Sequence, residues 1–246
     1  MDAKVLNDLK SWFATYAKSF YTGDQEIQSM VLQKEEHSLI VAGICREIAA
    51  SLGLDAPELA MAEAVGLCHD VGRFKQATVY RTFRDRISVD HGRLGVEELK
   101  AAGVDAMLSE ADWSAMAYAV RWHNAIALPP QPDERLTLFG QIIRDADKLD
   151  IYRVLPPSPP AAGCTPALEA GLIAGEMLSY DAIRTADDRK LVMLSWLYDI
   201  CFPWTRAAIA ARGHAEAILA SLPPSPAVPA IRKTIAAYLA SRLTSR

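Results

Sequence analysis

Apolar residues recur at helical spacing along most of the chain, and no segment shows the sustained alternation of a β-strand. Residues 71–89 show no clear period and are expected to form a loop. Pro203 is expected to kink or break a helix over residues 191–202. The pattern predicts helices over about residues 9–20, 34–52, 55–70, 90–102, 113–123 and 136–147, and others beyond residue 160. The chain is therefore predicted to be an all-α bundle with additional C-terminal helices.

The run of prolines at residues 156–160 is the one obvious linker. We expect a helical domain with an N-terminal helix over residues 1–155. A second part, residues 156–246, is expected to be a helical extension that packs on it. A length of 246 residues with 51% apolar residues suits this organisation.

Several His and Asp residues lie where polar side chains are unusual. His37 and Asp147 are on the apolar faces of their predicted helices, and His69-Asp70 ends another helix. A single His on an apolar face is more often a hydrogen-bonded core residue than a metal ligand. The joint occurrence of these ligand types on helices that bury the same faces favours a divalent metal site.

The order His, His-Asp, Asp on successive helices resembles the HD superfamily of metal-dependent phosphohydrolases. The matching residues and motifs are His37, the segment His69-Asp70-Val71-Gly72-Arg73 and residues 144–150. The resemblance covers about residues 30–155. It implies an HD-domain helical bundle. It also implies a first metal site whose ligands are His37, His69, Asp70 and Asp147.

His91 and His123 extend this resemblance to the two-metal branch of the superfamily, in which the Asp of the His-Asp pair bridges both ions. The resemblance then implies that these two histidines hold the second metal. The alternatives are that His91 is a surface residue and that His123 is a core or substrate-contacting residue. The expected cofactor is one or two divalent ions, chosen among Mn, Fe, Zn, Ni, Co and Mg.

The function implied is hydrolysis of a nucleotide or another small phosphate monoester or diester by metal-activated water. The candidate catalytic residues are Asp70, Arg73 and Lys148, although Lys148 has the alternative of pairing with a neighbouring carboxylate. Basic side chains are frequent in residues 71–89, but for most of them a solvated loop is the better interpretation. A di-iron oxygenase and a non-catalytic nucleotide sensor stay open, whereas the absence of a Gly-Tyr-Pro word disfavours the cyclic-dinucleotide branch.

The net charge of −4 disfavours a protein that coats nucleic acid. The expected partner is therefore a small phosphorylated substrate and not a nucleic acid duplex, and a homodimer is compatible with the sequence. No signal peptide and no apolar run of membrane-spanning length is seen, so a cytoplasmic protein without membrane association is expected. Four widely spaced cysteines fit a reducing compartment. His214 is expected to be structural or exposed.

Overall fold

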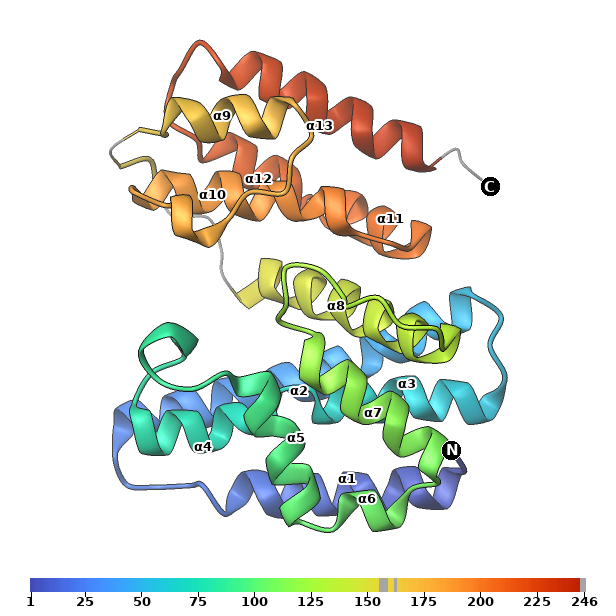
Figure 1. The fold of residues 1–246 in the computed structure, drawn as a ribbon. Helices are drawn as coiled ribbons and strands as arrows, with labels where there is room; N and C mark the ends of the chain where they lie inside the picture. The colour runs from blue at the N-terminus through green and yellow to red at the C-terminus, as the bar shows by residue number, and fades with distance from the viewer. Residues whose placement is uncertain (155–158, 162, 244–246) are drawn as a thin grey trace. The chain divides into compact units, whose positions relative to one another are not determined.

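The computed structural model describes residues 1–154, 159–161 and 163–243. These residues form helices joined by turns, and no strand occurs among them (Figure 1). The prediction of an all-α fold is confirmed. The chain divides into two compact units, residues 1–147 and 148–246, and helix α8 (Glu134–Val154) continues through the division. The predicted linker at residues 156–160 lies largely outside the described residues, so the domain boundary at 155/156 stays a prediction.

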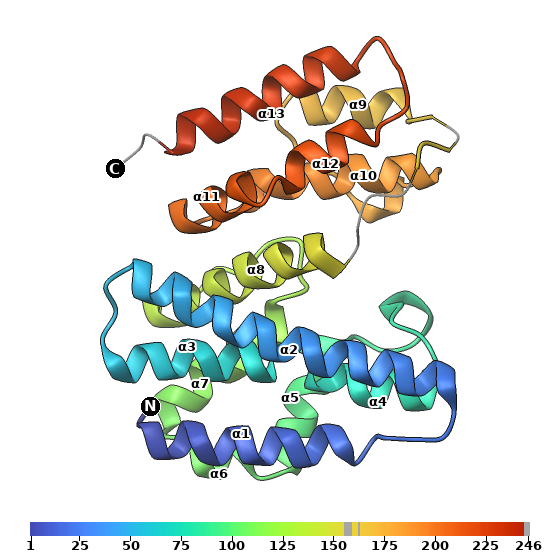
Figure 2. The same cartoon turned by 180° about the vertical axis from the view of Figure 1, so that it is seen from behind.

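Helices α1 to α7 and the first part of α8 make up the first unit. Helix α2 packs against both α3 and α4, α5 packs against α4 and α7, and α1 lies against α3 (Figure 2). A short 3₁₀ helix, Asp85–Ile87, precedes α5. The bounds are α1 Ala3–Lys18, α2 Gln25–Ser51, α3 Ala56–Cys68, α4 Val71–Tyr80, α5 His91–Ala101, α6 Val104–Met107 and α7 Glu110–Trp122.

The starts of these helices follow from capping side chains. Asp24, Asp55, Asp90 and Ser109 each accept a hydrogen bond from a backbone N–H in the first turn that follows. Such caps pair backbone N–H groups that the helix itself leaves without an acceptor, and each cap stabilises the fold by about 1 kcal/mol. After α2, Gly53 adopts a φ of 72°, a conformation that terminates helices at little cost for glycine.

The predicted loop over residues 71–89 is wrong in its first half, where α4 runs from Val71 to Tyr80. The buried face of α4 includes Gly72 and Gln76 beside Phe74 and Ala77, so its apolar stripe is interrupted and the helical period is hidden. Helix α2 also begins earlier than expected, at Gln25. Its first turns bury few residues, and an apolar pattern there is correspondingly weak.

Fully buried apolar side chains fix the helices of the first unit. The rings of Phe13 and Phe74 meet edge to face, with centroids 5.9 Å apart, and tie α1 to α4. Ile48 and Met61 are buried on α2 and α3, which pack against each other. Burying such a side chain contributes roughly 1.5–3 kcal/mol, so these contacts hold the helices that carry the polar residues described below.

The second unit contains several short helices and a longer one, Val228–Leu243, near its end. Asp188 is buried and accepts hydrogen bonds from the backbone of Thr165 and Thr185, which joins the start of α10 to the segment before α9. The predicted helix over 191–202 ends at Ser195, and Pro203 begins α11, where its missing N–H is harmless. The bounds are α9 Pro166–Ile173, α10 Ala186–Ser195, α11 Pro203–Ala211, α12 His214–Ala220 and α13 Val228–Leu243, with 3₁₀ turns at Tyr180–Ala182 and Trp196–Asp199.

Among the described helices, none has the length and apolar character needed to cross a membrane. Cys45 and Cys68 are buried free thiols in α2 and α3, and burial raises the pKa of both. His214, at the start of α12, is half-buried and stacks on Tyr152 with ring centroids 5.6 Å apart. Its expected structural role agrees with this packing.

Candidate metal centre

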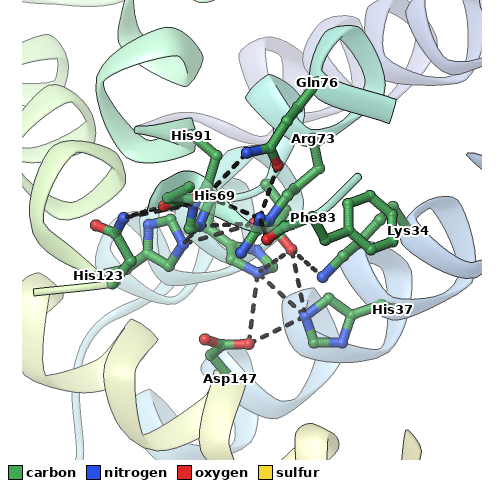
Figure 3. A network of polar contacts seen from close by, with 12 residues as sticks. Lys34, His37, His69, Arg73, Gln76, Phe83, His91, His123 and Asp147 are labelled. Atoms are coloured by element: carbon green, nitrogen blue, oxygen red, sulfur yellow. Dashed lines mark hydrogen bonds and ion pairs between the residues drawn. The ribbon is translucent and has the colours of Figure 1, made fainter. Parts of the chain in front are cut away.

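Polar side chains from separate helices of the first unit converge on one buried place (Figure 3). They come from α2, from the turn between α3 and α4, from the start of α5, from the end of α7 and from α8. The structure therefore brings together the residues that the sequence marked as candidate ligands. These are His37, His69, Asp70, His91, His123 and Asp147.

The turn between α3 and α4 places the two middle residues of this set. His69 is the C-cap of α3 and Asp70 the N-cap of α4, and both are buried. Gly72 then allows α4 to pass very close to α5, because a Cβ at this position would lie 2.3 Å from the backbone oxygen of His91. The short segment from His69 to Gly72 thus brings the start of α5 beside the Asp70 carboxylate.

Backbone carbonyls orient two of the imidazoles. Nδ1 of His69 lies 2.7 Å from the oxygen of Gly66, and Nδ1 of His123 lies 2.8 Å from the oxygen of Val120. A carbonyl oxygen only accepts, so the proton of each ring is on Nδ1 and the lone pair is on Nε2. Both Nε2 atoms face the centre of the cluster, which is the arrangement of a metal-ligating histidine.

A carboxylate orients the third ring. Nδ1 of His91 donates to Oδ2 of Asp85 at 2.6 Å, so the Nε2 lone pair of His91 also faces inward. Burial, and after it the Arg73 charge, lower the pKa of His91 to about 4, so the imidazole is neutral near pH 7. Burial alone would raise the pKa of Asp85, but the hydrogen bond from His91 and the nearby positive charges hold it below its usual value.

The first group of donors surrounds Oδ2 of Asp70. This oxygen lies 3.6 Å from Nε2 of His37 and 3.4 Å from Nε2 of His69. The Nε2 atoms of His37 and His69 are 3.3 Å apart, and Oδ1 of Asp147 lies 3.0 Å from Nε2 of His37. Burial would raise the pKa of Asp70, but Lys34 and His69 outweigh it and hold the pKa well below its usual value, so the group is a carboxylate.

The second group surrounds the other oxygen of the same carboxylate. Oδ1 of Asp70 lies 3.5 Å from Nε2 of His91 and 3.5 Å from Nε2 of His123. These two nitrogens are 2.9 Å apart. Asp70 therefore faces one donor group with each oxygen, as a carboxylate that bridges two cations does.

The donor set fits divalent metal ions. Donors about 2.1 Å from one ion at tetrahedral or octahedral angles are roughly 3.0–3.4 Å from each other, close to the separations found here. The lone pairs of His91 and His123 face each other, and Oδ1 of Asp70 is a buried atom without a hydrogen bond. A proton could satisfy two of these three acceptors, whereas a cation with several coordination positions satisfies all three. Imidazole and carboxylate are suitable ligands for Zn, Mn, Fe, Co or Ni.

Arg73 is beside the centre, but its Nη1 is bound to neighbouring groups of the protein. Its Nη1 donates to the side chains of Gln76 and Asp85 and to the backbone oxygen of Phe83. Gln76, which is fully buried, also donates to Asp85. Arg73 and Gln76 together hold the carboxylate that orients His91. The Nε of Arg73 is 3.6 Å from Asp70 and has no hydrogen-bond partner.

Three residues of the site escaped sequence analysis. Asp85 and Gln76 lie in the segment 71–89, which was expected to be a basic loop, and Lys34 was expected only as the start of a helix. Lys34 Nζ donates to Oδ2 of Asp70 at 2.7 Å (Figure 3). Its position three residues before His37, on the same helix face, is the signal that could have found it.

Other basic residues that the sequence considered have partners elsewhere. Lys148 Nζ donates to Asp199 at 2.6 Å, the pairing that the sequence left as an alternative to a catalytic role. Lys75 pairs with Glu98, and Arg81 pairs with acidic residues at the start of α2. Lys75 and Arg81 are thus engaged with acidic side chains away from the centre, whereas Arg73 lies beside Asp70.

Residues 35–152 match the sequence model of the HD domain, a range that contains all six converging residues. No curated protein and no solved structure matches the chain. The match agrees with the resemblance found in the sequence motifs, and it leaves the chemistry to be inferred from the site.

Proposed function

Residues 35–152 belong to the HD domain family, and we propose that the chain is a metal-dependent phosphohydrolase. The proposed substrate is a nucleotide or another small phosphate ester. The observation that carries this proposal is the Asp70 carboxylate, which faces two separate groups of inward-turned donors with its two oxygens. A complete donor set also argues against a nucleotide sensor with a degenerate site.

The six proposed ligands form two positions for cations. His37, His69 and Asp147 would hold the first ion together with Oδ2 of Asp70. His91 and His123 would hold the second ion together with Oδ1 of Asp70. When bound, divalent ions make a water nucleophilic near neutral pH and neutralise charge on a phosphoryl oxygen. The hydrogen bonds to Gly66, Val120 and Asp85 fix the imidazoles before any ligand arrives, which reduces the reorganisation that catalysis would otherwise require.

The surroundings suit a small anion. The side chain of Asp147 is 17% exposed and that of Lys34 is also 17% exposed, so the centre is reachable from solvent on that side. Lys34 and Arg73 bring positive charge to this place although the whole chain carries a net charge of −4. A small site that holds these two cations on an acidic protein favours a small phosphorylated molecule over a nucleic acid duplex.

The test is hydrolysis by purified protein loaded separately with Mn²⁺, Fe²⁺, Zn²⁺, Co²⁺, Ni²⁺ and Mg²⁺. A panel of phosphate monoesters and diesters is offered to each form. We expect turnover that EDTA abolishes and that Asp70→Asn lowers by at least 100-fold. The matched control is Asp8→Asn, since Asp8 is exposed and pairs with Lys4.

The same donors would also hold two iron ions, as in relatives that activate oxygen. Oxygen consumption by the anaerobically prepared iron form, measured beside the hydrolysis panel, separates these functions. Oxygen uptake coupled to substrate loss, without phosphate release in any metal form, would replace the proposed phosphohydrolase with an oxygenase.

A further inference from the structure

Lys34 is the residue nearest the centre whose chemistry the proposed metal ligands do not use. It lies on α2 three residues before His37, and both side chains face the same place (Figure 3). Its Nζ is 2.7 Å from Oδ2 of Asp70, the oxygen shared with His37 and His69. A lysine inside a set of metal ligands requires an explanation, because an ammonium has no lone pair to offer a cation.

The contacts of Lys34 leave part of its hydrogen-bonding capacity unused. Among the described residues its ammonium makes one hydrogen bond, to Asp70, and lies 5.3 Å from the centre of the Phe83 ring. The guanidinium carbon of Arg73 lies 5.5 Å from the same ring. Phe83 therefore contacts two cations that are both adjacent to Asp70. Since an ammonium has three N–H groups, two remain for another acceptor.

Metal binding would change the balance of forces on this ammonium. A lysine at hydrogen-bonding distance from an oxygen that ligates a dication is repelled by that ion. The arrangement regains favourable energy when an anion reaches both the ion and the lysine. Arg73 Nε is buried, forms an ion pair with Asp70 at 3.6 Å and has no hydrogen-bond partner, which points to the same need for an acceptor.

The charges at the centre indicate which anion balances the site. Five charged side chains contact one another or the histidines: the carboxylates of Asp70, Asp85 and Asp147 and the cations Lys34 and Arg73. Together they have a net charge of −1. Two divalent ions would bring this to +3. A phosphate monoester dianion with one hydroxide neutralises that charge, whereas a diester monoanion with one hydroxide leaves a positive excess.

We propose that Lys34 is a catalytic residue that binds a phosphoryl oxygen of a phosphate monoester dianion. In the metal-free protein Lys34 neutralises Asp70, and in the loaded protein its ammonium donates to the substrate phosphate. This inference rests on the proposed phosphohydrolase function and adds to it the substrate class and a residue that contacts the substrate.

The experiment compares Lys34→Gln, Lys34→Arg and a matched control, Lys75→Gln. Lys75 is a suitable control because its side chain is 47% exposed and pairs with Glu98. Each protein is saturated with Mn²⁺, its metal content is measured, and its affinity for inorganic phosphate is determined by calorimetry. We expect Lys34→Gln to weaken phosphate binding about 10- to 100-fold, the usual effect of losing a charged hydrogen bond, with unchanged metal content. Lys34→Arg should recover part of the affinity, and Lys75→Gln should behave like the unmodified protein.

Hydrolysis of monoesters and diesters by the same proteins separates the two proposals. If the unmodified protein hydrolyses esters and Lys34→Gln binds phosphate equally well, only the role of Lys34 is overturned. Phosphate binding that depends on Lys34, without hydrolysis of any ester, overturns the proposed reaction and supports the role of Lys34. A preference for diesters that Lys34→Gln leaves unchanged would overturn the assignment of a monoester dianion. Loss of phosphate affinity in both glutamine variants would also overturn the role of Lys34.

Discussion

Replacing Gly72 with alanine should separate the two donor groups. Gly72 lies in α4 where this helix meets the start of α5. An alanine Cβ would be 2.3 Å from the backbone oxygen of His91 and 2.7 Å from the backbone nitrogen of Gly95. Because both atoms belong to the backbone, no side-chain rotation relieves the overlap, and α4 and α5 must move apart.

The magnitude follows from these distances. The contact with His91 has to grow from 2.3 Å to at least 3.0 Å, a displacement of roughly 0.7 Å. Metal–ligand distances tolerate about 0.2 Å, so the second donor group should lose most of its affinity for a cation. Overpacking costs about 1–3 kcal/mol, and the better helix propensity of alanine offsets about 1 kcal/mol of this. The free energy of unfolding should therefore fall by only about 0–2 kcal/mol.

The assay is metal content per chain after saturation with Mn²⁺, measured with the thermal midpoint of the same sample. We expect the metal content of Gly72→Ala to fall from two ions per chain towards one while the protein stays folded. Gly43→Ala is the control, since Gly43 lies inside α2 and an added Cβ meets nothing within 4 Å. In this control the free energy of unfolding should rise by up to about 1 kcal/mol, and both ions should stay bound. Two bound ions in Gly72→Ala, with an unchanged midpoint, would refute the reasoning.

Three further outcomes follow from the site. Asp70→Asn should lower the affinity for both ions, and retention of one tightly bound ion would argue against a bridging carboxylate. Asp85→Asn should weaken only the second ion, by about 10- to 100-fold in a metal titration, because Asp85 orients His91; equal weakening of both sites would contradict this. In EDTA, the free energy of unfolding should fall as the pH drops from about 6.5 to about 4. His91 stays neutral in the folded protein down to a pKa of about 4, whereas in the unfolded chain it binds a proton near 6.5. A melting temperature that is constant over this window would exclude the assigned environment of His91.

Helical periodicity sufficed to predict the all-α fold and most helices of the first unit. It failed over residues 71–80, since a glycine and a glutamine occupy the buried face of α4. Gly72 is buried for close backbone approach, and Gln76 is buried to hold Asp85. Both needs arise from contacts with the segment that follows, and a local apolar pattern does not record them.

The six converging residues were named from the sequence because His37 and Asp147 lie on apolar helix faces and because the order of the His and Asp residues resembles that of the HD superfamily. The roles of Asp85 and Lys34 could not be predicted, because they depend on contacts with residues in other segments. Lys34 reaches Asp70 across 36 positions of the chain, and in sequence it is an ordinary charged residue on a helix. Arg73 was a candidate catalytic residue, and the structure shows that its Nη1 is bound to Gln76, Asp85 and a backbone oxygen.

The central claim is that Asp70 bridges two divalent cations. It is tested most directly by anomalous diffraction from a crystal of the Mn²⁺-saturated protein. The account predicts two peaks roughly 3.5–4 Å apart. One should lie among His37, His69 and Asp147, the other between His91 and His123, with Asp70 contacting both. No peak among these residues would contradict the account, and a single peak that leaves His91 and His123 without metal would contradict the dinuclear site.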